Sequence, residues 1–300
     1  MNGTLDGRVI ANFGRHITVE TGPGDMLDCR IKGRSLRPVC GDRVTLEQLP
    51  DGSGRILAIQ QRHSVLVRHD ARSGKQPLAA NIDRMIVVVA PKPALDPYMI
   101  DRYLAAGALL EIPAIILFNK TDLLTPDESD DLERVLKGYS EIGYPVLRTS
   151  VKRHTGLTAL ADTLRGHVGV VVGQSGTGKS SLLNALVPDA EIRIGEISQA
   201  TDEGRHTTTV SALYHLPGGG DLIDSPGVRG FQLWAMPARE LAGGFVEFQA
   251  YRGQCRFSDC SHLHEPGCRI MAAVEAGEIS SRRYESYRTL CAQVPEPGAD

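Results

Sequence analysis

One stretch, from Val170 to Leu186, constrains the fold of this chain more than any other. It reads VVVGQSGTGKSSLLNAL, which is an apolar run, a glycine-rich loop and the beginning of a second apolar-periodic segment. The apolar run is typical of a strand that is buried on both faces, and the residues after the loop favour a helix. A strand that leads through a tight loop into a helix indicates a parallel α/β sheet.

The loop in this stretch predicts phosphate binding. Residues 173–180 match G-x-x-x-x-G-K-S, in which backbone N–H groups and the following helix N-terminus surround an anion. We expect Lys179 to contact the β- and γ-phosphates and to assist catalysis, and Ser180 to bind Mg²⁺. The other expected contacts in the loop are Gly173, Gln174, Ser175, Gly176, Thr177, Gly178 and Ser181.

Two later motifs predict the magnesium side of the same site. In LIDSPG, Asp224 ends an apolar run and can hold Mg²⁺ through water, and the N–H of Gly227 can meet a γ-phosphate. The segment GRHTTT, residues 204–209, lies between the loop and this motif. A threonine there can complete the Mg²⁺ shell when γ-phosphate is present, which makes the segment a switch. Thr207 and Thr208 are both candidates.

The residue after the DSPG motif bears on the rate of hydrolysis. Ras-like enzymes place a glutamine there to position the attacking water, but this chain has Val228, which cannot form a side-chain hydrogen bond. We therefore expect slow hydrolysis in the isolated protein. His206 in the switch segment is the candidate to orient the water, because a neutral imidazole can accept its proton. We expect it to be solvent-exposed until a partner orders the segment.

The sequence LFNKTD, which lies upstream of the phosphate loop, predicts recognition of guanine. One carboxylate, that of Asp122, can accept hydrogen bonds from both N1–H and the 2-amino group of guanine, whereas adenine offers no such donor pair. Asn119 can link the base-binding loops, and the stem of Lys120 can lie along the base. TSVK, residues 149–152, resembles the second guanine loop of GTPases. The expected base-binding residues are Asn119, Lys120, Thr121, Asp122, Ser150 and Lys152.

The order of these motifs is inverted relative to an ordinary small GTPase, in which the phosphate loop comes first. Sites in a parallel α/β sheet form at the carboxyl ends of neighbouring strands, so position in space matters and order along the chain does not. Domain termini often lie close together, so joining them and opening the chain elsewhere is tolerated. The order NKxD, TSxK, phosphate loop, switch threonine and DxxG is that of a circularly permuted GTPase.

With its motifs in this order, the chain resembles the bacterial ribosome small subunit-dependent GTPase A family over essentially its whole length. The sequences AANID, GRHTTT and IDSPGVR and a C-terminal cysteine cluster carry the resemblance. It implies an OB-like barrel, a circularly permuted GTPase domain and a zinc domain. It also implies a GTP hydrolase that assists late maturation of the small (30S) ribosomal subunit and is stimulated by that subunit. The implied partners are the small subunit, its rRNA and GTP or GDP, and we expect a monomer.

We accordingly expect a multidomain α/β chain with three parts. Residues 1–68 show five short apolar runs separated by Gly and Pro turns, which predicts a small OB-like β-barrel, with an SH3-like barrel as the alternative. This part carries ten Lys and Arg against seven Asp and Glu, so the basic excess lies here. Residues 69–240 form the predicted permuted GTPase domain with a parallel sheet, and RSGKQP, residues 72–77, predicts an exposed loop. Residues 241–300 form a helical zinc-binding domain.

The third part contains a candidate metal centre. Cys255, Cys260, His262 and Cys268 have the spacing C-x4-C-x-H-x5-C, and three thiolates with one imidazole make a closed, structural Zn²⁺ site. A short segment with few large apolar residues needs such a cross-link. The resemblance implies the same four ligands. His264 is an alternative ligand two residues further on.

Composition limits where the chain acts. Apolar residues make up 41% and charged residues 23%, which is typical of a globular protein. The N-terminus lacks the charged-then-apolar pattern of a signal peptide, and no apolar run is long enough to cross a membrane. We therefore expect a cytoplasmic protein that does not contact a membrane.

Two other functions are compatible with these motifs. One is a checkpoint protein that binds RNA and GTP without hydrolysing the nucleotide, and the other is an ATP-using P-loop kinase in which NKTD occurs by chance. Turnover, and a comparison of GTP with ATP binding, would distinguish the three.

Overall fold

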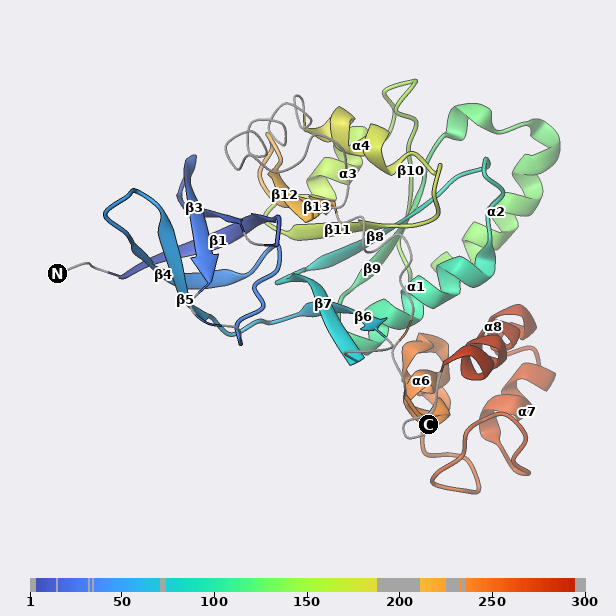
Figure 1. The fold of residues 1–300 in the computed structure, drawn as a ribbon. Helices are drawn as coiled ribbons and strands as arrows, with labels where there is room; N and C mark the ends of the chain where they lie inside the picture. Colours follow the sequence, from blue (N-terminus) through green and yellow to red (C-terminus); the bar gives the residue numbers. More distant parts are fainter. Residues whose placement is uncertain are drawn as a thin grey trace.

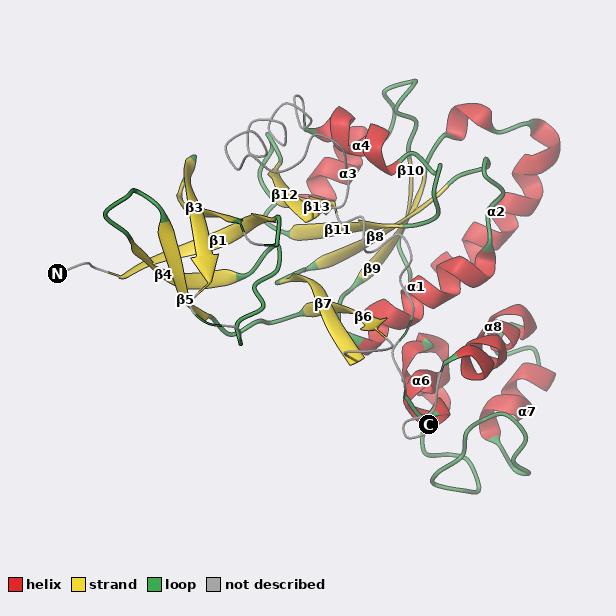
Figure 2. Cartoon of the chain, viewed as in Figure 1, coloured by secondary structure: helices red, strands yellow, loops and turns green. Residues whose placement is uncertain are grey.

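The structure, a computed structural model, describes residues 4–14, 16–31, 33, 35–70, 74–187, 211–224, 233 and 236–294 of the 300-residue chain. Three parts follow one another across the molecule (Figure 1). A β-barrel lies at one end, a sheet covered by helices lies in the middle, and a small helical part packs beside α1 at the other end. Strands dominate the first half of the chain and helices the last part (Figure 2).

The barrel consists of five strands: β1 (Thr4–Asn12), β2 (Ile17–Gly22), β3 (Asp25–Ile31), β4 (Arg43–Gln48) and β5 (Gly54–Ile59). Their order is β1-β2-β3-β5-β4, and pairing of β1 with β4 closes the barrel. All pairs are antiparallel except β3 with β5. Alternate residues such as Val9, Val19, Leu46 and Ile56 point inward and form its core. The expected OB-like barrel is confirmed.

A β-hairpin follows the barrel and corrects one expectation. Strand β6 (Val65–Asp70) pairs with β7 (Gly74–Ala80), so residues 74–77 of the expected loop belong to a strand. Pro77 is tolerated because it lies at a β-bulge, where the register of the hairpin shifts between Leu66 and Val67.

The central sheet contains five parallel strands in the order β10-β9-β8-β11-β13. They are β8 (Arg84–Val89), β9 (Ala114–Phe118), β10 (Val146–Arg148), β11 (Val168–Val172) and β13 (Asp221–Asp224). The sheet is mixed rather than wholly parallel, because β12 (Ser211–His215) forms an antiparallel hairpin with β13. A short connection of five residues permits only this antiparallel return.

Helices cover both faces of this sheet. Met85, Val87 and Val89 of β8 pack on the side of α1 (Pro97–Leu109) and α2 (Pro126–Glu141), and Ile86 and Val88 pack on the other side. That other side is covered by α3 (Leu157–Leu164) and α4 (Lys179–Leu186). A short 3₁₀ helix, η1 (Thr121–Leu123), follows β9. Burial on both faces explains the continuous apolar runs of the sequence.

The barrel and the central sheet share one strand. The end of β1 pairs with β12, with Ala11 opposite Ala212 and Asn12 opposite Ser211. The barrel strands and the central strands therefore form one sheet of eleven strands. Ile10 and Ala11 of β1 belong to the two cores on either side of the central sheet.

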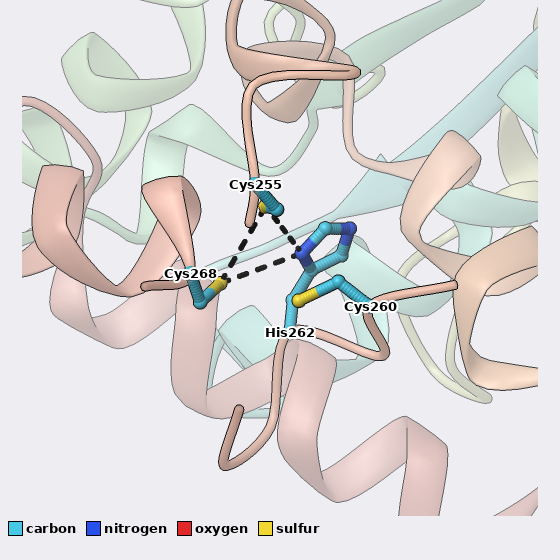
Figure 3. A group of neighbouring side chains, drawn as sticks. All are labelled: Cys255, Cys260, His262 and Cys268. Atoms are coloured by element: carbon cyan, nitrogen blue, oxygen red, sulfur yellow. Dashed lines mark hydrogen bonds between the residues drawn. The ribbon is translucent and has the colours of Figure 1, made fainter. Parts of the chain in front are cut away.

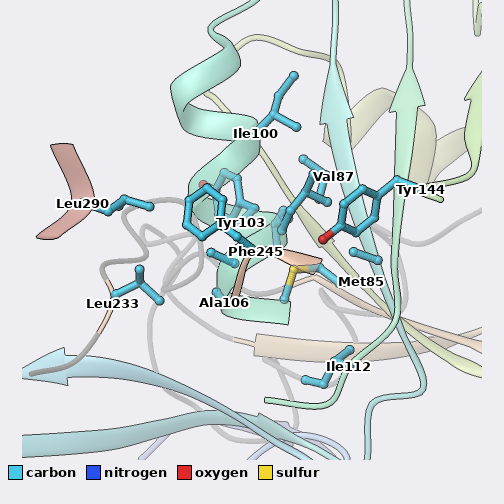
Figure 4. Packing of buried hydrophobic residues seen from close by; sticks show 14 of the residues in the cluster. Met85, Val87, Ile100, Tyr103, Ala106, Ile112, Tyr144, Leu233, Phe245 and Leu290 are labelled. Atoms are coloured by element: carbon cyan, nitrogen blue, oxygen red, sulfur yellow. The ribbon is translucent and has the colours of Figure 1, made fainter. Parts of the chain in front are cut away.

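The C-terminal part contains α6 (Ala238–Leu241), η3 (Ala242–Gly244), η4 (Val246–Tyr251), α7 (Arg269–Glu275) and α8 (Ser281–Gln293). Phe245 and Leu290 of this part lie close to Tyr103 of α1 (Figure 4). The apolar core of the central sheet thus continues into the C-terminal part. None of the described helices has the length and hydrophobicity that a membrane crossing requires.

A buried ion cluster also joins the C-terminal part to the central part. Arg283 of α8 is 2% exposed and donates to Asp101 of α1 at 2.8 Å and to both carboxylate oxygens of Glu247 at 2.7 and 2.8 Å. Tyr139 donates to the same oxygen of Asp101 at 2.6 Å, and Arg282 donates to the other oxygen at 2.9 Å. Since every charge has partners, the cluster can be buried at a tolerable desolvation cost.

Candidate functional site

The predicted nucleotide motifs meet at one edge of the central sheet. The phosphate loop follows β11, NKTD follows β9, TSVK begins at the end of β10, and Asp224 is the last residue of β13. These four strands are parallel neighbours or next neighbours, so their carboxyl ends lie at the same edge. This is where a doubly wound sheet forms its ligand site.

The phosphate loop has the backbone that only glycine adopts readily. Gly173, Gly176 and Gly178 have φ of 135°, 84° and 95°. A Cβ atom at Gly173 would lie 2.3 Å from the carbonyl oxygen of Val88, and one at Gly178 would lie 2.5 Å from Asn119 Nδ2. The glycines therefore allow the loop to pack against the base-binding motif as well as to expose its N–H groups.

Lys179 and the hydroxyl residues lie where the pattern predicts them. Lys179 begins α4, is buried, and its Nζ donates to the carbonyl oxygens of Gly173 at 2.8 Å and Gln174 at 2.5 Å. Its positive charge is thus held inside the loop, at the N-terminus of α4. Ser180 and Ser181 are exposed at the same helix end, as are Gln174 and Ser175 of the loop.

Asn119 joins the three loops of the site. Its Nδ2 donates to the carbonyl oxygen of Thr177 at 3.0 Å, and its Oδ1 accepts from Thr149 Oγ1 at 3.0 Å. Asn119 is 1% exposed, so both hydrogen bonds are protected from water. Lys120, with φ of 58°, reaches over the phosphate loop and donates to the carbonyl oxygens of Gly176 and Lys92. Asn119 thus connects the two loops that are predicted to bind the base, and it also connects the first of them to the phosphate loop.

Asp122 is held ready to accept hydrogen bonds. Ser150 Oγ donates to Asp122 Oδ1 at 2.5 Å and itself accepts from the backbone N–H of Arg153 at 3.1 Å. The Ser150 hydrogen bond, with help from the charges of Lys152 and Arg153, lowers the pKa of the Asp122 carboxyl. The carboxylate is exposed to solvent and ionised at neutral pH, as a partner for two N–H donors must be.

Asp224 ends β13 opposite Ala212 of β12, at the carboxyl edge where α4 begins. Its place agrees with the predicted magnesium side. The switch segment with His206, Thr207 and Thr208, and likewise Gly227 and Val228, lies outside the described residues.

A second site lies in the C-terminal part, where Cys255, Cys260, His262 and Cys268 converge (Figure 3). Their ligand atoms all lie within 4.8 Å of one another. Cys255 Sγ and Cys268 Sγ are 4.0 Å apart, and each is 3.5 Å from His262 Nδ1. A tetrahedral Zn²⁺ with Zn–S bonds of about 2.3 Å would separate two thiolates by about 3.8 Å, so the donor set fits. His264 is not part of the group, and it is exposed.

Several residues that were not expected from the sequence hold the loops of the two sites in place. Thr149, which begins TSVK but is not among the expected contacts, donates from its hydroxyl to Asn119. Lys92 accepts from Lys120 through its backbone carbonyl oxygen, a contact that no sequence pattern marks. Glu265 accepts hydrogen bonds from the backbone N–H groups of Ser261, Leu263 and His264 and closes the metal loop. Burial acts to raise the pKa of the Glu265 carboxyl, but these hydrogen bonds and that of the Ser261 hydroxyl hold it well below its usual range. A glutamate four residues after a serine in a short loop was the available signal.

Comparison with known sequences agrees with this geometry. Residues 59–234 match the sequence model of the RsgA GTPase family. The chain is 44% identical over 296 residues to the small ribosomal subunit biogenesis GTPase RsgA of Shewanella oneidensis, covering 97% of this chain and 84% of that protein. It is 46% identical over 288 residues to the protein of the same name from Chromohalobacter salexigens, covering 95% and 84%.

Solved structures show the same fold. YjeQ from Thermotoga maritima superposes with a TM-score of 0.79 at 31% identity, over 97% of this chain and 99% of that one. YloQ, described as a circularly permuted GTPase, superposes with a TM-score of 0.74 at 28% identity, over 97% and 95%. The expected circularly permuted GTPase fold is confirmed.

Proposed function

The chain belongs to the RsgA GTPase family, and we propose that it binds GTP with Mg²⁺ at the carboxyl edge of the central sheet and hydrolyses it during biogenesis of the small ribosomal subunit. The observation that carries the proposal is the convergence of Asp122 and Lys179. Asn119 hydrogen-bonds Thr177 of the phosphate loop and Thr149 of the second base loop, so the proposed guanine reader and the phosphate loop form one site.

The described residues divide the work of binding between the two ends of the nucleotide. Asp122, positioned by Ser150, accepts the two guanine donors, while Lys120 lies between the base motif and the phosphate loop. Lys179 and the N–H groups of the glycine loop stabilise negative charge on the transferred phosphoryl group. Ser180 and Asp224 would hold Mg²⁺, which neutralises charge on the β- and γ-phosphates when it is bound.

The remaining predicted contacts stay part of the proposal. Thr207 or Thr208 would complete the magnesium shell, Gly227 would meet the γ-phosphate, and His206 would orient the attacking water. We propose the domain limits 1–68, 69–240 and 241–300 for the barrel, the GTPase domain and the zinc domain, with β1 shared between the first two sheets.

The proposed partner is the small ribosomal subunit with its rRNA, and the proposed place of action is the cytoplasm, where that subunit is assembled. The names of the relatives from Shewanella oneidensis and Chromohalobacter salexigens support the assignment to small-subunit biogenesis. We further propose that the small subunit stimulates hydrolysis. We also propose that the protein acts as a monomer, since one chain supplies the predicted nucleotide and metal ligands.

Turnover tests this function directly. We expect slow GTP hydrolysis by the protein alone, a clear increase with isolated small subunits, and no hydrolysis of ATP above background. Lys179→Ala should bind and hydrolyse little nucleotide while its circular dichroism spectrum stays that of the parent. Tight GTP binding without turnover in either condition would instead favour a non-hydrolysing checkpoint protein.

We also propose that the cluster of three cysteines and His262 holds one structural Zn²⁺ per chain. The four donors leave no open coordination position, and the geometry is that of a closed site. Metal analysis of freshly purified protein should give about one equivalent of zinc. Cys260→Ala should lower this value sharply and expose the loop of residues 252–268 to proteolysis, while GTP binding stays close to that of the parent. A parent protein without zinc would contradict the proposal.

A further inference from the structure

The β12–β13 hairpin joins the two elements that are predicted to hold Mg²⁺. Ser211, its first residue, lies two positions after the end of the switch segment in the sequence, and Asp224, its last residue, pairs with Ala212. Both elements therefore leave the hairpin at the same end. Whatever fixes the position of this hairpin also fixes where Asp224 and Ser211 lie relative to the phosphate loop.

The barrel holds this hairpin at its magnesium end. Ala11 and Asn12 of β1 pair with Ala212 and Ser211. Ala11 is 1% exposed and belongs to the same apolar core as Leu182 and Leu183 of the helix after the phosphate loop. A strand of the barrel is thus the direct neighbour of the strand that begins where the switch segment ends.

The barrel also holds the other end of the hairpin, through charged side chains. Arg8 Nη1 of β1 lies 2.5 Å from Asp221 Oδ2, and the other oxygen of Asp221 lies 2.6 Å from His215 Nδ1. His215 Nε2 lies 3.0 Å from Glu20 Oε2 of β2. We call Arg8, Glu20, His215 and Asp221 the barrel clamp. From Arg8 through Asp221 and protonated His215 to Glu20 the charges alternate in sign, with a barrel residue at each end and the two hairpin residues between them. All but His215 are at most 23% exposed, so the attraction acts in a fixed geometry.

We propose that Arg8 and Glu20 are positioning residues for GTP hydrolysis. Through the barrel clamp and the pairing of β1 with β12, they couple the orientation of the barrel to the placement of Asp224 and of Ser211. The proposal rests on the proposed function, because it connects the barrel, which carries the basic excess of the chain, to the reacting end of GTP. Neither residue touches the nucleotide.

The test compares the barrel clamp with an exposed ion pair that joins two strands of the barrel to each other. Arg55 and Glu47 are joined at 3.0 Å on adjacent barrel strands and do not contact the hairpin. Arg8→Gln and Glu20→Gln are therefore matched to Arg55→Gln and Glu47→Gln as controls. Gln at position 20 can still accept the hydrogen bond that Gly24 N–H makes with Glu20 Oε1.

Two readouts apply to all four variants. The first is hydrogen exchange in the protein alone with a GTP analogue bound, followed in peptides that cover residues 211–224. We expect faster exchange in both clamp variants and unchanged exchange in both controls. The second is the rate constant kcat with saturating small subunits, which should fall about fivefold or more in the clamp variants while the Kd for GTP and for the subunit stays within about twofold.

The outcomes separate the two proposals. If the parent is not stimulated by small subunits, the proposed function fails, and hairpin exchange still decides whether the clamp positions the hairpin. Unchanged exchange in Arg8→Gln and Glu20→Gln overturns the inference. A fall in kcat that is equal in the clamp and control variants also overturns the inference. A fall in kcat that is explained by weaker binding of the small subunit overturns it too.

Discussion

At the scale of single residues, we propose that nucleotide choice depends on the carboxylate of Asp122. Ser150 fixes its orientation, and the low pKa keeps it ionised, so it can accept from two adjacent N–H groups. Asn at this position keeps the shape but replaces one acceptor oxygen by a donor. The change therefore tests the hydrogen-bond pattern rather than the volume of the side chain.

We expect Asp122→Asn to weaken GTP binding by about tenfold or more for each charge-assisted hydrogen bond that is lost. The same variant should gain affinity for xanthosine triphosphate, whose 2-oxo group can accept from the new amide. Titration with fluorescent analogues of both nucleotides measures the two affinities. If the variant binds GTP as tightly as the parent, NKTD is not the guanine reader.

His215 should make the stability of the fold depend on pH, and its partners determine the sign of that dependence. Its ring faces Asp221 on its own hairpin and Glu20 on β2, with Arg8 across Asp221 and with Asp6 and Arg43 lining the same surface hollow. The hydrogen bond to Asp221 and the charge of Glu20 raise the pKa of the imidazole, while partial burial opposes the rise. A group with a raised folded-state pKa stabilises the fold fully below its unfolded pKa, which is about 6.5 for His.

The contribution of His215 to the free energy of unfolding should therefore be lost as pH rises from about 6.5 through the raised value. Denaturant unfolding of the parent and of His215→Gln at a series of pH values measures it. The difference in stability between them should be largest at the acid end of this range and shrink toward the alkaline end. A difference that is constant across the range, or that grows with pH, would show that the imidazolium form is not the one held by the two carboxylates.

At the scale of elements, a buried ion cluster centred on Arg283 attaches helix α8 to α1. Arg283 is surrounded by Asp101, Glu247 and the rings of Tyr139 and Phe245, the latter 4.8 Å from the guanidinium carbon. Removing this cation takes both guanidinium hydrogen bonds from the buried carboxylate of Glu247 and leaves Asp101 with Arg282 and Tyr139 as its partners. Breaking a buried pair in this way costs about 3–5 kcal/mol, far more than the pair itself contributes.

Arg283→Met should lower the free energy of unfolding by about 3–5 kcal/mol, or release the C-terminal part from α1. Arg288→Met, one turn along the same helix, removes an exposed i,i+3 pair with Glu285 and should change stability by less than about 0.5 kcal/mol. Denaturant unfolding and limited proteolysis compare the two. Equal effects would show that the buried cluster is not what attaches α8.

The elements also show which parts of the structure local sequence can predict. The strands β8, β9 and β11 and the helix α4 follow from apolar runs and the glycine loop, and the metal ligands follow from cysteine spacing. The pairing of β1 with β12 joins residues 200 positions apart, and neither strand carries a mark of its partner. The same holds for Arg283, which reads as an exposed helical charge in sequence and is buried only because α1 and η4 supply carboxylates. Long-range partners of ordinary residue types are what sequence patterns could not predict.

At the scale of the whole molecule, the permutation places the magnesium side of the site between the two outer parts. The barrel contacts the β12–β13 hairpin, and the chain after Asp224 leads into the zinc domain, which packs on α1. A partner that binds both outer parts would thus act on the segments that flank the γ-phosphate. In an unpermuted GTPase these segments lie in the interior of the chain, without a direct connection to a terminal domain.

This arrangement favours the switch segment as the source of the catalytic group. Val228 cannot position water, and among the residues near the predicted magnesium threonines only His206 has a neutral form that can accept a proton near pH 7. If the small subunit orders the segment, the imidazole can be brought to the attacking water. The contribution of such a group to the rate is typically about 10²–10⁴-fold.

We predict that His206→Ala keeps the affinity for GTP within about twofold but loses most of the rate that small subunits stimulate, by about a hundredfold. Single-turnover hydrolysis with saturating subunits measures the chemical step, and a filter-binding assay shows whether the variant still binds them. His154→Ala, a change of an exposed histidine in the loop after the second guanine motif, is the matched control and should behave as the parent. Since a structural role in the switch would weaken subunit binding or GTP affinity, loss of the rate with both retained assigns the histidine to the reaction. A His206→Ala variant that small subunits stimulate fully would exclude it, and the water would then have to be positioned by a group of the ribosome.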